Sequence, residues 1–114
     1  MRFLIVFISL FYLIQNSPDY DIIGTWNTLN ENTKIQIIEQ KGLLIGRIKS
    51  SDNPKAQVGR LILKDLIKTG NSWSGKIYVV KKNEWCDVDI TSKKNTLNLK
   101  IHFGFINKSI VWEK

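Results

Sequence analysis

Alternation of apolar and polar residues runs from Ile22 to the end of the chain, and this feature constrains the fold most. The clearest case is residues 97–103, where every second residue is apolar: Leu97, Leu99, Ile101 and Phe103. A period of two places successive side chains on opposite faces of an extended strand, whereas an amphipathic helix repeats every three or four residues. The chain is therefore predicted to be all-β.

The same alternation predicts eight short strands, joined mostly by tight turns. They fall at residues 22–28, 34–37, 43–49, 60–68, 73–79, 85–90, 97–103 and 109–113. Residues 60–68 are ambiguous, because Leu61, Leu63 and Ile67 favour one face while Ile62 and Leu66 favour the other. A helical turn is the alternative there, but the β-branched residues and the turn-forming residues 69–71 favour a strand.

An open antiparallel meander leaves two edge strands with unpaired backbone groups, and closure into a barrel removes both edges. We therefore predict a small eight-stranded antiparallel up-and-down barrel, with an open β-sandwich as the alternative. The interior of such a barrel is either filled by side chains or holds one small ligand. At 114 residues the chain has room for one domain of this kind.

Residues 1–17 have the features of a secretory signal peptide. Arg2 precedes a mostly apolar stretch, residues 3–14, and polar residues follow up to Pro18. The stretch is too short to span a bilayer, which takes about 20 apolar residues. A buried N-terminal strand or an uncleaved anchor is the alternative. We predict one exported domain, residues 18–114, in the periplasm or outside the cell, with no stable membrane span after processing.

The chain is basic, with 17 Lys and Arg against 10 Asp and Glu and a formal net charge of +7. Such a surplus suits nucleic acid, a membrane surface, an acidic ligand or a solvated exterior. The longest basic runs are the pairs Lys81-Lys82 and Lys93-Lys94, and both fall at expected turns. Nucleic-acid-binding proteins usually concentrate their charge on one face. No nucleic-acid partner is expected.

The polar residues that could carry chemistry are few. Asp87 and Asp89 lie on one strand face, and without a calcium-loop pattern they are interpreted as solvent-facing charges that folding does not need. His102, the only histidine, is expected on the exposed polar face, with no partner at a recognisable catalytic or zinc spacing. Cys86 falls on the apolar face, as a buried and unreactive thiol. We predict no catalytic residue, metal or cofactor, and no enzyme activity.

Tryptophan is the residue type that most invites a binding hypothesis. By parity, Trp26 and Trp73 face inward beside Gly24 and Gly75, and Trp112 lies in the last strand. An indole beside a glycine can fill the end of a barrel by covering the bare backbone, or it can shape the floor of a small cavity. Trp26, Trp73 and Trp112 are therefore candidates either for the core or for the wall of a ligand site.

Several motifs occur in the order of a known family. They are Gly-x-Trp at residues 24–26, Gly-x-x-x-Gly-Arg-Ile at 42–48, Gly-x-x-Ile-Leu-x-x-Leu at 59–66, Trp-x-Gly-Lys-Ile at 73–77 and the closing residues 111–114. Together they resemble the exported bacterial family catalogued as domain of unknown function 2147. That resemblance implies a lipocalin-like barrel and an exported protein, but no reaction. Lys114 stands where this family usually has arginine, which puts arginine packing across a tryptophan in doubt.

Three function hypotheses follow. The first is a binding module for a small apolar ligand or a cell-envelope component. The second is a structural or interaction protein whose barrel is filled and which acts through its surface, with an exposed apolar patch that includes the outward-facing Trp85. The third, an enzyme, requires polar groups that converge in a cleft, and the inward positions do not supply them.

Overall fold

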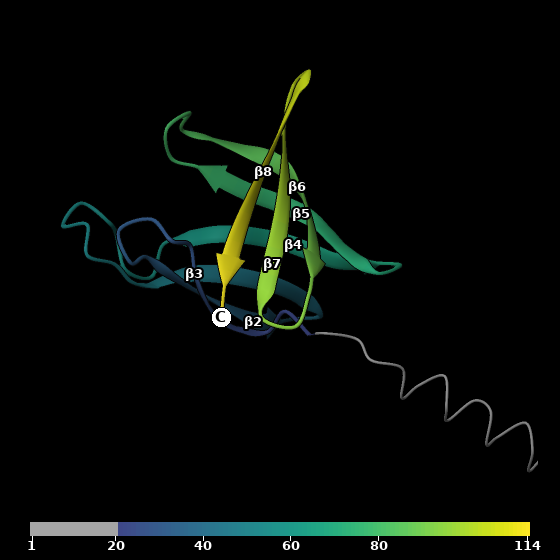
Figure 1. Cartoon of the computed structure of the whole chain (residues 1–114), viewed down its shortest axis with the longest axis horizontal. Coiled ribbons are helices and arrows are strands. Elements are labelled where there is room, and N and C mark those ends of the chain that lie inside the picture. The colour runs from purple at the N-terminus through teal and green to yellow at the C-terminus, as the bar shows by residue number, and fades with distance from the viewer. Residues whose placement is uncertain (1–20) are drawn as a thin grey trace, which may run out of the picture.

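The structure is a computed structural model that describes residues 21–114; the predicted signal peptide lies outside the described residues. Eight antiparallel strands form a closed barrel in which sequence neighbours are also neighbours in the sheet (Figure 1). They are β1 (Gly24–Asn27), β2 (Lys34–Gln40), β3 (Leu43–Ser50), β4 (Leu61–Thr69), β5 (Ser72–Val79), β6 (Glu84–Ser92), β7 (Thr96–Phe103) and β8 (Ile106–Glu113). The predicted all-β up-and-down barrel is confirmed. Among residues 21–114, no helix is long and apolar enough to cross a membrane.

One or both bounds of every strand differ from the prediction by one to three residues, and β2 extends to Gln40 instead of ending at residue 37. β8 begins at Ile106 and not at residue 109, because only Gly104 and Phe105 form the turn before it. Gly104 has a φ of 56°, and this left-handed conformation allows so tight a turn. β1 is shorter than expected, yet Ile22, which precedes it, is fully buried.

The barrel closes between β1 and β8, where Asn27 lies opposite Glu113. Beneath this short seam lies Trp26, whose side chain is 1% exposed and whose indole Nε1 donates a hydrogen bond of 2.8 Å to the Ile22 carbonyl. Lys114 covers the same ring, with its Nζ 4.9 Å from the ring centroid. The predicted inward position of Trp26 and the predicted pairing of the first and last strands are both confirmed.

A bulge in β4 explains the ambiguous pattern of residues 60–68. Asp65 adopts a φ of 56°, and the pairing with β5 shifts between Lys64 and Ile67. A bulge inserts an extra residue and thereby reverses the alternation beyond it. Leu63 and Leu66 are consequently both buried, while Ile67 is exposed. The prediction that Leu63 and Ile67 share a face was wrong because parity counting assumes an uninterrupted strand.

Gly75 on β5 faces this bulge at very close range. A Cβ at Gly75 would lie 2.7 Å from Leu66 Cδ2 and 2.7 Å from the Lys64 carbonyl oxygen. These distances are shorter than any ordinary contact to a Cβ, and one of the atoms belongs to the backbone. The expectation that the Trp73 indole covers Gly75 is therefore corrected: the nearest atoms come from β4.

All eight strands contribute to one apolar cluster inside the barrel. The largest fully buried side chains of this cluster are Trp26, Ile22, Ile35, Ile37, Leu63, Leu66, Ile90, Leu97, Leu99 and Val88. Among residues 21–114, no polar or charged residue is buried. Apolar burial of this kind is the main favourable term in folding.

Replacing Trp26 by alanine should lower the free energy of unfolding by about 3–5 kcal/mol, because a large buried side chain leaves a cavity under the seam. Urea denaturation followed by circular dichroism measures this change. Trp85→Ala, which alters the outer face, should have a smaller effect. An unchanged midpoint for Trp26→Ala would contradict the core role of this residue.

Gly75→Ala should destabilise the barrel by about 1–3 kcal/mol, because the added methyl group must push the β4 bulge away. The effect is steric, since Gly75 has no left-handed φ. Thermal melts of this variant compared with Ser72→Ala, on the same strand, provide the measurement. Equal melting temperatures for the two variants would show that the bulge adapts freely.

Candidate functional site

The structure places the three candidate tryptophans in or against the core. Trp26 is 1% exposed and Trp112 is 3% exposed, and both belong to the apolar cluster. Trp73 is partly buried and packs against the same cluster. Their surroundings are apolar side chains, so these residues have the position expected of core filling.

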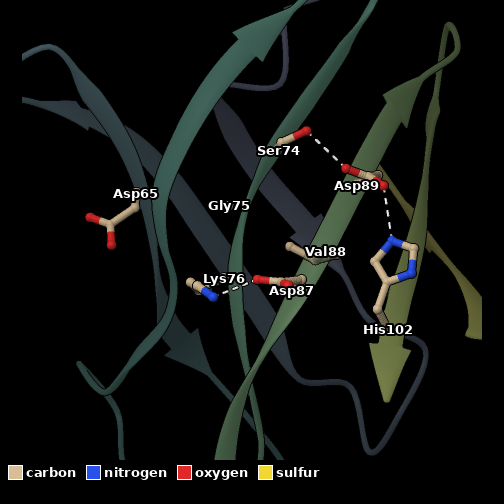
Figure 2. Close-up of a pocket in the computed structure, with 8 residues that line it drawn as sticks. All are labelled: Asp65, Ser74, Gly75, Lys76, Asp87, Val88, Asp89 and His102. Atoms are coloured by element: carbon tan, nitrogen blue, oxygen red, sulfur yellow. Dashed lines mark hydrogen bonds and ion pairs between the residues drawn. The ribbon is translucent and has the colours of Figure 1, made fainter. Parts of the chain in front are cut away.

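Polar groups instead converge on the outside of the barrel, where β4, β5, β6 and β7 form an open depression of about 460 Å³ (Figure 2). Alternation directs their side chains outward, away from the core. The depression is lined by Asp65, Ser74, Gly75, Lys76, Asp87, Val88, Asp89 and His102. This is the candidate site, and it combines three carboxylates with a lysine, a histidine and a hydroxyl.

Groups that lie opposite each other on β5 and β6 interact in pairs. Ser74 is opposite Asp89, and its Oγ donates a hydrogen bond of 2.8 Å to Asp89 Oδ1. Lys76 is opposite Asp87, and the two form an ion pair in which both side chains stay exposed. The Asp87 hydrogen bond and charge raise the pKa of Lys76. Such cross-strand pairs stabilise a sheet locally.

The next opposed pair on the outer face of these two strands is aromatic. Tyr78 and Trp85 meet edge to face, with ring centroids 5.4 Å apart and an interplanar angle of 69°. The Arg60 guanidinium lies 4.4 Å from the Tyr78 ring centroid, and Lys64 Nζ lies 4.3 Å from that of Trp85. The outward direction of Trp85 is confirmed, but it is half-buried beside Tyr78 and Lys64 and is not part of an exposed apolar patch.

Asp89 stands between Ser74 and His102, as Figure 2 shows. Its Oδ2 lies 2.9 Å from His102 Nε2, and the other ring nitrogen, Nδ1, lies 2.7 Å from Asn107 Oδ1. In a Ser-His-Asp triad the imidazole contacts the hydroxyl and the carboxylate contacts the far side of the imidazole, whereas here the carboxylate lies between the hydroxyl and the imidazole. The three residues therefore form a hydrogen-bonded network without the order of a catalytic triad.

Both nitrogens of His102 face oxygen atoms, an arrangement that suits the imidazolium form, which donates from both. The hydrogen bond with Asp89, followed by that with Asn107, raises the pKa of His102, while nearby Lys100 opposes the rise. In return, the hydrogen bonds from His102 and Ser74 lower the pKa of Asp89.

Cys86 is buried, as predicted. Burial raises the pKa of its thiol, and the carboxylate of Glu84, 3.9 Å from Sγ, acts in the same direction. A raised pKa disfavours the thiolate, which is the reactive form.

The exposed position predicted for Asp87 is confirmed, but Asp89 and His102 are half-buried in a shared network. Sequence analysis missed this network because it treated the strands one at a time. The signal was available: if the turn at residues 93–95 sets the register, His102 falls opposite Asp87 and diagonal to Asp89. Side chains at diagonal positions are close enough to pair.

Comparisons with protein-family models, curated proteins and solved structures found no match to this chain.

The Asp89–His102 pair should make stability depend on pH. Asp89 contributes above its ordinary carboxyl pKa of about 4, and His102 contributes fully below its ordinary pKa of about 6.5. The contribution is lost as the pH rises through the raised pKa of His102, or falls through the lowered pKa of Asp89. The melting temperature of the native protein should exceed that of His102→Gln by more at pH 5.5 than at pH 9. A difference independent of pH would contradict the assignment.

Proposed function

We propose that this chain is an exported, non-enzymatic interaction protein that engages a cell-envelope component with the outside of a filled barrel. The observation that carries the proposal is the occupied interior, to which all eight strands contribute buried apolar side chains. An eight-stranded barrel has room inside for side chains or for one small ligand. Here the residues that would form a ligand wall pack as core.

An apolar ligand inside the barrel is the competing hypothesis. To enter, it would have to displace large buried side chains such as Leu63, Leu97 and Leu99. Removing the contacts of one buried leucine costs about 2–5 kcal/mol. Protein interiors are packed as tightly as organic crystals, so such displacement is strongly opposed. The filled barrel is therefore the better-supported alternative.

The outer depression supports the non-enzymatic part of the proposal. The Ser74 hydroxyl and the His102 imidazole both contact Asp89, while Asp87 pairs with Lys76. The lowered pKa of Asp89 makes this carboxylate a weaker base towards the hydroxyl. Export rests on the pattern of residues 1–17, and a bacterial envelope rests on the motif resemblance described above. Export and the bacterial envelope are therefore both proposed from the sequence.

Thermal melts with apolar probes test whether the interior is occupied. Wild-type protein should show no rise in melting temperature with benzene or with dodecanoate, because a ligand stabilises only by binding the native state. Leu99→Ala is the matched control, since the cavity that it leaves should admit benzene and raise its melting temperature. Binding of one dodecanoate per wild-type chain would overturn the proposal.

A further inference from the structure

The two ends of the barrel differ in their turns. Because neighbouring strands are antiparallel, alternate turns lie at the same end. One end, here called the first rim, carries the turns at residues 28–33, 51–60, 80–83 and 104–105. The opposite rim carries the turns at residues 41–42, 70–71 and 93–95. In Figure 1 the first rim runs along the left and upper side, and the opposite rim along the right and lower side.

Every turn of the first rim exposes a large apolar side chain. Leu29 is 57% exposed, Val58 69% and Val80 65%, while Phe105 is fully exposed. The turns of the opposite rim consist of Lys, Gly and Asn residues only. Among the turns, exposed apolar residues therefore occur at one end of the barrel, although the core does not use them; Ile38, Ile67 and Val111 are exposed on the strands instead.

The turns do not need these residues for their own geometry. Turns favour Gly, Asn, Asp and Ser, which tolerate left-handed backbone or bond to it. Leu29 nevertheless adopts a φ of 65°, and Phe105 follows Gly104 at the tip of the two-residue turn between β7 and β8. The fold does not explain why large apolar side chains occupy these turns. Their exposure indicates a role in contact with something outside the barrel.

Positive charge accompanies the apolar residues on one half of this rim. Lys81 and Lys82 follow Val80, and Lys108 lies on β8 just beyond the Phe105 turn. The turn between β5 and β6 reaches the β7–β8 hairpin, since Lys82 Nζ lies 5.1 Å from the Phe103 ring centroid. These lysines therefore lie in or next to the two turns that expose Val80 and Phe105.

Two acidic residues of the rim lie away from these turns, and a third lies beside the β5–β6 turn. Glu31 and Asp52 belong to the other two turns, which are joined by a hydrogen bond from the Asp52 amide to the Glu31 carbonyl. Glu84 follows Asn83 on β6, and its carboxylate accepts from the Cys86 thiol. The half of the rim around Val80 and Phe105 therefore combines exposed apolar residues with three lysines and the single carboxylate of Glu84, which leaves it with a net positive charge.

Separate apolar tips surrounded by lysines fit a fluid surface better than a rigid one. A protein partner requires a continuous complementary patch, whereas a bilayer lets each tip enter between headgroups independently. Anionic headgroups attract nearby lysines, at about 1 kcal/mol for each residue close to the surface. The net charge of the exported chain, +6 once Arg2 is removed with residues 1–17, adds attraction at longer range.

We propose that the first rim docks on the surface of an anionic lipid bilayer, with Val80 and Phe105 entering the headgroup region and Lys81, Lys82 and Lys108 facing the lipid phosphates. The inference rests on the proposed function, because it names the envelope component and the surface that meets it. The barrel stays outside the hydrocarbon layer in this arrangement.

Sedimentation with vesicles tests the docking. The protein, as cells export it, is mixed with vesicles of phosphatidylglycerol and phosphatidylcholine in equal amounts, or of phosphatidylcholine alone. The double variant Val80→Ser with Phe105→Ser should bind the anionic vesicles at least about tenfold more weakly, because two apolar side chains no longer enter the lipid. The wild type should bind pure phosphatidylcholine at least about tenfold more weakly, because the lysines lose their partners.

The matched control is the double variant Ile38→Ser with Ile67→Ser, which removes two exposed apolar side chains from the strands. It should bind within about twofold of the wild type, since these positions lie away from the first rim. Melting temperatures of both double variants establish that each is folded. Equal loss of binding in the two variants, or no binding by the wild type, would overturn the docking.

A fluorophore locates the contact. Val58→Cys places a reactive thiol on the first rim and Asn71→Cys places one on the opposite rim, while Cys86 is buried. An environment-sensitive dye should shift to shorter wavelength on anionic vesicles at position 58 and not at position 71. A shift at position 71 and not at position 58 would place the opposite rim against the vesicles. That result would also overturn the proposal.

Two further outcomes separate the proposals. Dimerisation without lipid that is lost in Val80→Ser with Phe105→Ser would assign the first rim to a second copy and overturn the lipid inference. If the wild type does not bind vesicles and dodecanoate does not raise its melting temperature, only the docking inference fails. If dodecanoate occupies the interior, the filled-barrel function fails whatever the vesicles show.

Discussion

Closure of the sheet between β1 and β8 is the constraint on which the rest of the structure depends. β1 has four residues, and Asn27 opposite Glu113 is the register pair that joins it to β8. So short a seam can form only a few backbone hydrogen bonds. Side-chain packing must therefore supply much of the stability of the closure. Trp26 supplies it from inside, tied to the Ile22 carbonyl and covered by Lys114. Lys114 thus takes part in closing the barrel.

In a closed and narrow barrel the core side chains occupy the interior. The bulge at Asp65 adds Leu66 to that interior, and Gly75 provides the space in which the bulge approaches β5. Once these side chains fill the barrel, groups available for recognition lie outside. The outer face of β5 and β6 is itself arranged in opposed pairs, which stabilise the sheet and satisfy most polar groups there. Neither the core nor these pairs explain the exposed apolar residues in the turns of the first rim.

Two-residue alternation was sufficient to predict the fold class, the number of strands and the inward direction of Trp26. It was also sufficient to place Cys86 inside and Trp85 outside. At residues 60–68 the pattern was ambiguous and assigned Ile67 to the wrong face, because a bulge depends on how β4 pairs with β5 and counting alternation does not locate it. It also missed the network of Ser74, Asp89 and His102, whose members are brought together by register across three strands.

The sequence by itself determined that this chain is an all-β barrel with an apolar inside and a basic outside, because strand periodicity and composition are local properties. Whether Trp26, Trp73 and Trp112 formed a core or a cavity was decided only by the tertiary structure, since that outcome depends on how side chains from all strands share one volume. The rim of apolar turns likewise emerged only when the strands were assembled. Leu29, Val58, Val80 and Phe105 are far apart in the sequence, and antiparallel pairing in a closed barrel places them at the same end.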